Sequence, residues 1–381
     1  KKSDLKRLNL ESNENIYHMW KFSFPKLIDE FYLLNRTIKY KLSNDKINLW
    51  ICKNFEFFLI KVNFWYQFFQ RKNVKIDLDS DETDENNIVK RIALKYLDGI
   101  SIGRNRSYIS EDVYHWVCNF PQDVLFTWGN DMVHRLSKSY NYNDRILISG
   151  YPYPKIKKKI DYNFNSKITK KILIFDCVHS NDPENYICIS TSTIEKFYLR
   201  IFEWLKDKED IGVIYKTKKM NNYDTLSDEI KKKFINFEKN GRIYIEKNPL
   251  RNTVSNFTDD ADIAICTTLL TPSVMYECLI NNLICLSYSN NLFQEKESSY
   301  VNKYFKNLFF NNLNDLITRL NELYVHNFID NSVDWNCLDE IDPYRDNSGH
   351  KRIGNFIKNL LNNFKNKLSG TESLKKAIEE Y

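Results

Sequence analysis

The chain has 381 residues, a length typical of two domains, and carries 56 Lys and Arg residues against 50 Asp and Glu residues. The net charge of +6 is spread over short runs, whereas nucleic-acid-binding proteins concentrate basic residues on one face, so we expect no nucleic-acid partner. Hydrophobic residues make up 42%, which excludes a disordered chain. The sequence shows neither an apolar run of about 20 residues nor a signal-peptide pattern, so we expect a cytoplasmic protein.

The eight cysteines follow no metal-binding or disulfide pattern. No pair has C-x-x-C spacing, and most of them lie within apolar runs. The sequence therefore predicts buried free thiols in a reducing compartment, without a zinc site or a disulfide framework.

Short apolar runs alternate with longer helical patterns between residues 47 and 150. The predicted strands cover residues 47–52, 74–78, 99–103, 124–128 and 145–150. The predicted helices cover residues 55–70, 87–97 and 131–139. This alternation predicts βαβ units, in which parallel strands form a doubly wound α/β sheet.

Two prolines in Tyr151-Pro152-Tyr153-Pro154 interrupt the alternation, and a basic run follows, so we place a domain boundary here. The pattern then resumes. Further predicted strands cover residues 171–177, 211–216, 242–245, 262–267 and 283–288. Further predicted helices cover residues 192–206, 224–237, a segment before 262, 271–281, 313–324 and 351–367. We predict one lobe over 1–154, a second over 155–340 and a tail over 341–381, with ligands bound at the carboxyl ends of the strands.

A hydroxyl-rich loop and the helix after it form the strongest candidate site. Thr268, Thr271 and Ser273 lie between an apolar strand and a helix whose free N–H groups could seat a phosphate. Glu277 follows one turn later, where its carboxylate could accept hydrogen bonds from a ribose diol. An ordinary capped helix with a surface Glu277 is the alternative interpretation.

Two other loops follow strands of the second lobe. Lys216 and Lys218 come directly after an apolar strand and could reach an anionic ligand; a solvated basic turn is the alternative. His179 follows the first strand of this lobe and could hold the same ligand, although a lone histidine is more often structural.

In the first lobe, a polar loop follows the strand predicted over 99–103. Arg104 and Arg106 suit the binding of carboxylate or phosphate groups. Nearby, Glu111, Asp112 and His115 are candidates for a general base that deprotonates a hydroxyl group, and ordinary surface residues are the alternative.

Four passages in order resemble the GT-B glycosyltransferases of bacterial surface-polysaccharide synthesis, which build capsule, O-antigen and lipopolysaccharide. Residues 123–152 are similar to the passage of that family with a "WG" and a "GxP" motif. Tyr215-Lys216-Thr217-Lys218 resembles its "YKPK". Residues 268–286 resemble its donor helix, "S-x-L-x-P-S-x-x-x-E-A". Residues 341–354 are similar to its tail, "DPFRDGxGxxRIG".

The resemblance implies a GT-B fold, with two Rossmann-like lobes facing a cleft and a C-terminal helix that crosses back to the first lobe. It also implies that Lys216, Lys218, Ser273 and Glu277 bind the phosphates and ribose of a nucleotide-sugar donor. Arg345 and Asp346 would help to close the cleft over the donor. Both residues lie in the tail passage, residues 341–354, which departs from the family motif at Tyr344 and Asn347.

One departure concerns the loop after the strand predicted over 99–103. Relatives often carry a histidine motif there, whereas this chain has Arg104-Asn105-Arg106. The chain also lacks the "HGT"-like loop of glycerophosphate polymerases, which argues against a phosphotransferase.

We therefore expect a glycosyltransferase that moves a sugar from a nucleotide-sugar to a glycan or lipid-linked glycan, with or without peripheral contact at the inner face of the membrane. The D-x-D string at 77–79 opens an acidic turn, so we expect no metal and no cofactor beyond the nucleotide-sugar co-substrate. A nucleotide-sugar epimerase of the same fold is the enzymatic alternative, and a catalytically degenerate glycan-binding or scaffold protein is the other.

Overall fold

A computed structural model of the chain describes residues 46–79, 86–107, 120–137, 145–155, 160–181, 189–219, 222–246, 248, 252–267, 273–289, 306–330, 333 and 335–381. The chain forms two compact units. One holds the described residues up to Gly103 together with Pro121–Val124 and Phe356–Tyr381, and the other holds Arg104–Phe120 and Leu125–Asn355. No helix of the described ranges combines the length and apolar character that crossing a membrane requires.

The first unit begins with a long aromatic helix, α4 (Lys46–Lys72). The strand predicted over 47–52 is wrong, because these residues form the first turns of α4. A short apolar run does not distinguish a strand from a buried helical segment, and no Gly or Pro separates it from the helical pattern that follows. The helix predicted over 55–70 is confirmed as the rest of α4.

Helix α4 packs against α5 (Asn86–Tyr96). Phe69 of α4 and the fully buried Ala93 and Leu94 of α5 form a small core, with the ring of Trp65 beside it. Strand β1 (Ile76–Asp79) runs parallel to β2 (Ile100–Arg104). The predicted strands at 74–78 and 99–103 are therefore confirmed within two residues.

The C-terminal segment completes the first unit. Helix α13 (Gly349–Lys365) begins among residues of the second unit and ends in the first, and α14 (Gly370–Glu379) follows it. Gly370 N donates to Asp98 Oδ1 at 2.9 Å, and a Cβ atom at this glycine would lie 2.8 Å from Asp98 O. The chain therefore returns to its N-terminal half, as predicted, although α14 itself was not predicted.

The first sheet has the strand order β1-β2-β3-β4, with β3 at Val124–Thr127 and β4 at Ile146–Ile148. Helix α6 (Asn130–Ser137) connects β3 to β4, which pair in parallel. The strand, helix and strand predicted over 124–150 are confirmed.

The second sheet has six parallel strands in the order β12-β11-β10-β5-β8-β9. Their bounds are β5 Lys170–Phe175, β8 Ile211–Lys216, β9 Ile243–Glu246, β10 Ile263–Thr267, β11 Cys285–Tyr288 and β12 Phe309–Phe310. Counted along the chain this order is 3-2-1-4-5-6 from one edge, the order of the Rossmann sheet. The predicted doubly wound α/β fold is confirmed.

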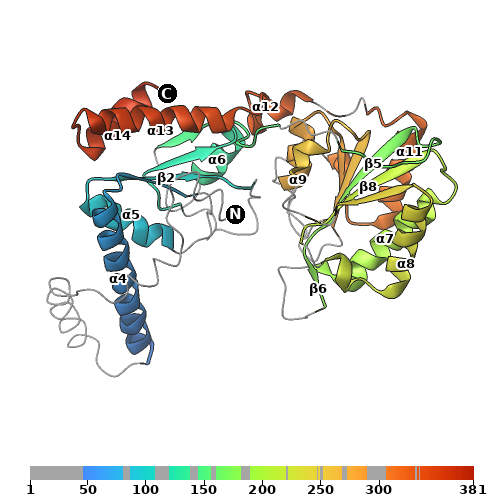
Figure 1. Ribbon diagram of the computed structural model, residues 1–381, viewed down its shortest axis with the longest axis horizontal. Coiled ribbons are helices and arrows are strands. Elements are labelled where there is room, and N and C mark those ends of the chain that lie inside the picture. Colours follow the sequence, from blue (N-terminus) through green and yellow to red (C-terminus); the bar gives the residue numbers. More distant parts are fainter. Residues whose placement is uncertain are drawn as a thin grey trace. The chain divides into compact units, whose positions relative to one another are not determined.

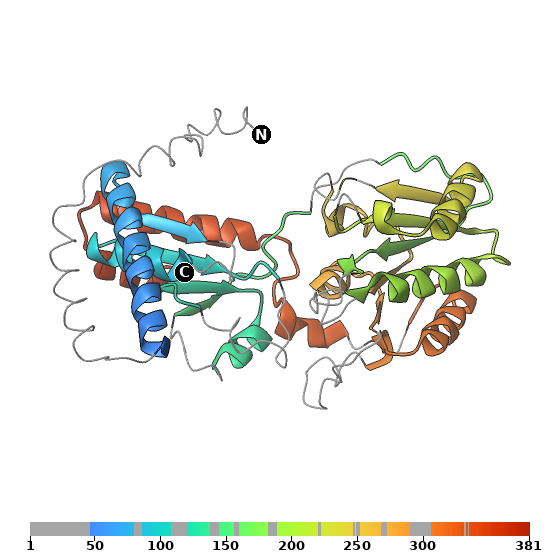
Figure 2. The same ribbon diagram turned by 90° about the horizontal axis from the view of Figure 1, so that it is seen from below.

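Helices cover both faces of the six-stranded sheet (Figures 1 and 2). Helices α7 (Thr191–Leu205), α8 (Asp228–Lys239) and α11 (Leu313–Val325) lie on one face, and α7 contacts both of the others. Helix α9 (Ser273–Ile280) lies on the other face, against β10 and β11. The connections on the two faces therefore diverge between β5 and β10, which are neighbours in the sheet.

The remaining elements of the described residues are short. They are β6 (His179–Ser180), β7 (Ile189–Ser190), η2 (Tyr223–Thr225), η3 (Val254–Asn256), η4 (Lys306–Leu308), η5 (Trp335–Cys337) and α12 (Leu338–Ile341). The helix predicted before residue 262 is only the single turn η3. Patterns of two to four residues carry no usable periodicity, so the sequence did not reveal these elements.

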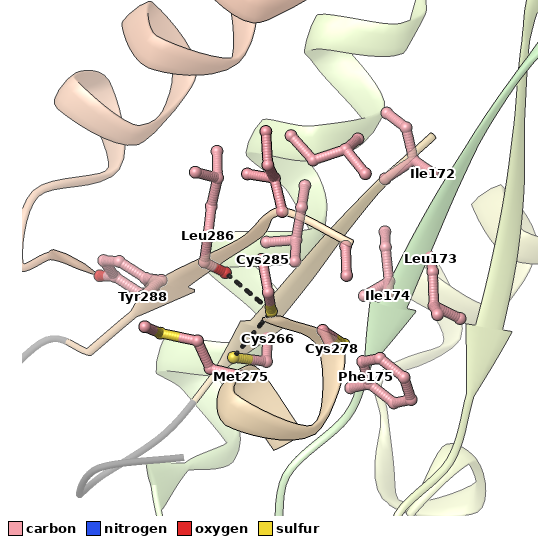
Figure 3. Close-up of a cluster of buried hydrophobic side chains, with 14 of the residues drawn as sticks. Ile172, Leu173, Ile174, Phe175, Cys266, Met275, Cys278, Cys285, Leu286 and Tyr288 are labelled. Carbon is pink, nitrogen blue, oxygen red and sulfur yellow. Dashed lines mark hydrogen bonds between the residues drawn. The ribbon is translucent and has the colours of Figure 1, made fainter. Parts of the chain in front are cut away.

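The core around α9 is built from sulfur-bearing and aliphatic side chains. Cys285 Sγ lies 3.7 Å from Cys266 Sγ, and Met275 and Cys278 of α9 lie against them (Figure 3). The cysteines whose side chains the structure describes are free, as predicted: Cys177, Cys266, Cys278, Cys285 and Cys337. These side chains anchor the buried side of α9, whose partly exposed positions are Ser273, Val274 and Glu277.

Candidate functional site

Four adjacent strands of the second sheet end side by side, and polar residues follow directly after them at this carboxyl edge of the sheet. Cys266, Phe175, Lys216 and Glu246 are aligned across β10, β5, β8 and β9 by the strand register. Residues directly after this row therefore gather at the carboxyl ends of the strands. In open α/β sheets ligands bind at this edge, where the connections diverge to opposite faces, here between β5 and β10.

Glu277 of α9 belongs to this edge. It is a partly exposed position between the buried Tyr276 and Cys278. Tyr151 Oη donates a hydrogen bond of 2.7 Å to Glu277 Oε2. Burial raises the pKa of Glu277, whereas the hydrogen bond from Tyr151 and the charges of Lys218 and Lys216 lower it.

The two predicted lysines lie close enough to Glu277 for their positive charges to lower the pKa of its carboxyl group. Burial lowers the pKa of Lys216, as does the like charge of Lys218, while Glu246 and Glu277 raise it. Lys218 is exposed, two residues after the end of β8. The structure thus places Lys216, Lys218 and Glu277 within electrostatic reach of one another, and their predicted binding of a phosphate and a ribose stays a prediction.

Ser273 is the first residue of α9, next to the edge of the sheet. The other two hydroxyl residues of the predicted phosphate seat, Thr268 and Thr271, lie outside the described residues. The predicted contacts of these three side chains with a phosphate stay a prediction.

A buried polar network surrounds Asp176, the residue directly after β5. Asp176 Oδ1 accepts from Tyr198 Oη at 2.9 Å, and Asp176 Oδ2 accepts from Asn222 Nδ2 at 2.7 Å. Burial raises the pKa of Asp176, while the hydrogen bond from Asn222 and the charge of His179 lower it. The network fixes the loop that carries His179.

His179 is buried, with 7% of its surface exposed. Its Nδ1 lies 3.2 Å from Thr191 Oγ1, and its Nε2 has no hydrogen-bond partner among the described residues. A buried imidazole nitrogen without a partner costs free energy, and nothing among the described residues offsets this cost at Nε2. Its predicted role in donor binding stays a prediction.

The segment after β4 is clasped by residues just before α13. Asp342, which is fully buried, accepts backbone hydrogen bonds from Tyr151 N at 3.2 Å, Tyr344 N at 3.1 Å and Arg345 N at 3.2 Å. A Cβ atom at Gly349 would lie 2.6 Å from Tyr151 O, so only glycine permits this approach. Residues 342–349, the "DPYRDNSG" motif, therefore hold the segment that carries Tyr151, and we call these residues the clasp.

Arg345 and Asp346 of this clasp each form an ion pair with a neighbouring side chain. Arg345 Nη2 lies 2.7 Å from Asp339 Oδ1 and donates to Trp335 O at 2.5 Å. Asp346 accepts two hydrogen bonds from Arg352, at 2.7 and 3.1 Å. Their predicted contacts with a donor stay a prediction.

The predicted first-lobe loop is described only as far as residue 107. The guanidinium of Arg104 lies 5.0 Å from the ring centroid of Tyr153, and Tyr153 Oη donates to the backbone oxygen of Arg106 at 3.2 Å. The buried Asn105 has no partner for either side-chain amide atom among the described residues. The three candidate bases, Glu111, Asp112 and His115, lie outside the described residues.

Sequence reasoning missed Tyr151, Asp176 and Asn222 as site residues. Tyr151 was predicted as part of the domain boundary and of the passage similar to the "GxP" motif, and neither Asp176 nor Asn222 was singled out. The signal for Tyr151 was its place in the "GYP" motif, but its contact with Glu277 joins residues 126 apart in sequence.

No protein-family profile and no sequence of a curated protein matches this chain. Solved structures do match. A protein from Listeria monocytogenes described as a "putative UDP-N-acetylglucosamine 2-epimerase" is 14% identical with a TM-score of 0.53, covering 83% of this chain and 81% of that one. This likeness shows the fold, which is the two-sheet GT-B fold.

Two further structures have lower TM-scores. MnaA of S. aureus, solved with UDP, is 15% identical with a TM-score of 0.48, over 81% of each chain. The lipopolysaccharide outer core galactosyltransferase WaaB is 8% identical with a TM-score of 0.42, over 78% of this chain and 80% of that one.

Proposed function

We propose that this chain is a glycosyltransferase that moves a sugar from a nucleotide-sugar donor to a glycan or lipid-linked glycan of a bacterial surface polysaccharide. One observation carries the proposal. A carboxylate, Glu277, and two ammonium groups, Lys216 and Lys218, lie together at the ligand-binding edge of a Rossmann sheet.

The charges of this group suit a nucleoside diphosphate. The ammonium groups of Lys216 and Lys218 attract the diphosphate, and the N-terminus of α9 at Ser273 adds backbone N–H donors. The carboxylate of Glu277 accepts hydrogen bonds from the two ribose hydroxyls. His179 Nε2 offers a further hydrogen bond from the end of β5.

In the transfer, the bond between the anomeric carbon and the diphosphate oxygen breaks while a bond to an acceptor hydroxyl oxygen forms. Negative charge develops on the departing diphosphate, and the nearby lysines stabilise it without a divalent cation. The acceptor proton passes to a general base, for which Glu111, Asp112 and His115 remain the candidates. Arg106 belongs to the same loop.

A nucleotide-sugar epimerase is the second candidate, because the Listeria monocytogenes structure that shares the fold is described as one. An epimerase inverts a carbon of the donor sugar by removing and returning a proton, and it needs no acceptor. The two candidates therefore differ in what the same donor site does next.

The test is to incubate the protein in D₂O with UDP-, GDP-, CDP- and CMP-sugars, with and without lipid-linked glycan acceptors. A transferase releases free nucleotide only when an acceptor is present and leaves deuterium out of the unreacted donor. Epimerised, deuterated donor formed without acceptor would establish the epimerase instead. The Glu277→Gln variant serves as the control, since either activity of this site has to weaken in it.

A further inference from the structure

Tyr151 is held rigidly by its surroundings. Only 1% of its surface is exposed. Its backbone N donates to Asp342 Oδ2 at 3.2 Å, and its backbone oxygen accepts from Gly349 N at 3.2 Å. Its ring packs edge-on against Trp128, with centroids 5.0 Å apart. The position of its hydroxyl is therefore fixed by the chain rather than by Glu277.

The hydroxyl of Tyr151 is the donor in its contact with Glu277. Burial and the neighbouring carboxylate raise the pKa of Tyr151 well above its usual value, so the phenol keeps its proton. The hydrogen bond goes to Oε2 only. Among the described residues, no side chain donates to Oε1, so this oxygen keeps its capacity to accept hydrogen bonds.

We infer that Tyr151 is a positioning residue for donor binding: its hydroxyl holds one oxygen of Glu277 so that the other oxygen faces the ribose diol of the nucleotide. This inference rests on the proposed function. It assigns no contact between Tyr151 and the donor, and it explains why the "DPYRDNSG" clasp fixes the backbone of this one tyrosine.

The hydrogen bond also opposes the effect of burial on the pKa of Glu277. The groups that face its carboxyl are Tyr151 from the segment after β4, and Lys216 and Lys218 from the exit of β8. Burial raises the pKa of Glu277, and these three groups lower it. Without the Tyr151 hydroxyl the pKa rises further, so Glu277 takes up a proton at a higher pH and accepts hydrogen bonds less well.

The experiment measures the dissociation constant of the tightest-binding nucleotide among UDP, GDP, CDP and CMP, from pH 5 to pH 8, by titration calorimetry. Wild type is compared with Tyr151→Phe, which keeps the ring. Tyr153→Phe is the matched control, because among the described residues its hydroxyl donates to the backbone oxygen of Arg106 and not to Glu277. Circular dichroism and urea unfolding establish the temperature at which all variants are fully folded.

The expected loss in Tyr151→Phe is about tenfold in affinity at pH 7, typical of a hydrogen bond to a charged group. The acid limb of the affinity profile moves to higher pH, since the carboxyl has lost one hydrogen-bond donor that lowers its pKa. Tyr153→Phe stays within about twofold of wild type, as a substitution away from Glu277 should.

A double-mutant cycle separates positioning from a general structural effect. In a Glu277→Gln background the acid limb disappears, and adding Tyr151→Phe weakens binding by less than about twofold. A tenfold loss in that background, or an equal loss at every pH, overturns the inference. Wild-type protein that binds none of the nucleotides contradicts the proposed function itself, which is a distinguishable result.

Discussion

Replacing Gly129 with alanine tests how closely the end of β3 packs against α12. A Cβ atom at this position would lie 2.3 Å from Glu340 O and 2.5 Å from Ile341 O. Both are backbone atoms, so no side-chain rotation relieves the contact. The backbone of α12 has to retreat by about 1 Å, and overpacking of this kind costs about 3 kcal/mol where the neighbours are rigid.

Gly354 provides the matched control. It is an exposed residue inside α13, and a Cβ atom there meets nothing within 4 Å. Alanine in an exposed helix interior stabilises by about 1 kcal/mol relative to glycine. The two Gly→Ala variants should therefore differ by about 4 kcal/mol in the free energy of unfolding, with opposite signs relative to wild type.

Urea unfolding, followed by circular dichroism and by tryptophan fluorescence, measures both variants against wild type. The expected order of midpoints is Gly354→Ala above wild type and wild type above Gly129→Ala. A midpoint of Gly129→Ala equal to or above that of wild type refutes the close packing of Gly129 on α12.

Glu277→Ala should raise the donor KM about tenfold while kcat changes less, and unchanged steady-state kinetics would remove Glu277 from the donor site. Lys218→Ala should weaken binding of UDP but not of uridine, while its exposed neighbour Lys219→Ala leaves both unchanged; equal losses for the two ligands speak against a diphosphate contact. Asp342→Ala should destabilise by about 3 kcal/mol, because three backbone N–H groups lose a buried acceptor. Urea unfolding checks this value, and a change under about 1 kcal/mol argues against the clasp.

The alternating half of the fold was predictable because each strand there is a short apolar run bounded by polar turns. The strand predicted over 211–216 matches β8 residue for residue. The first turns of α4 were predicted as a strand because residues 47–52 also form a short apolar run. Periodicity identifies long elements, and tertiary packing decides the rest.

The candidate site was predictable where one strand and the loop after it carry the residues. Lys216, Lys218 and Glu277 each follow an apolar segment, so the sequence indicated them. Tyr151 and Asp342 act through contacts between distant parts of the chain, and nothing in the local pattern of either reveals burial. Their roles became visible only in the three-dimensional structure.

The proposed function requires that the edge of the second sheet around Glu277 bind a nucleotide. The most direct measurement is a thermal-shift screen of wild type and Glu277→Ala with UDP, GDP, CDP, CMP and, as an unrelated compound, NAD. At 100 times its Kd a ligand stabilises the native state by about 2.7 kcal/mol, which corresponds to about 5 °C or more in Tm. The proposed function predicts a shift of this size with one nucleotide in wild type and a smaller one in Glu277→Ala. The absence of a shift with every nucleotide, or an equal shift in both proteins, contradicts it.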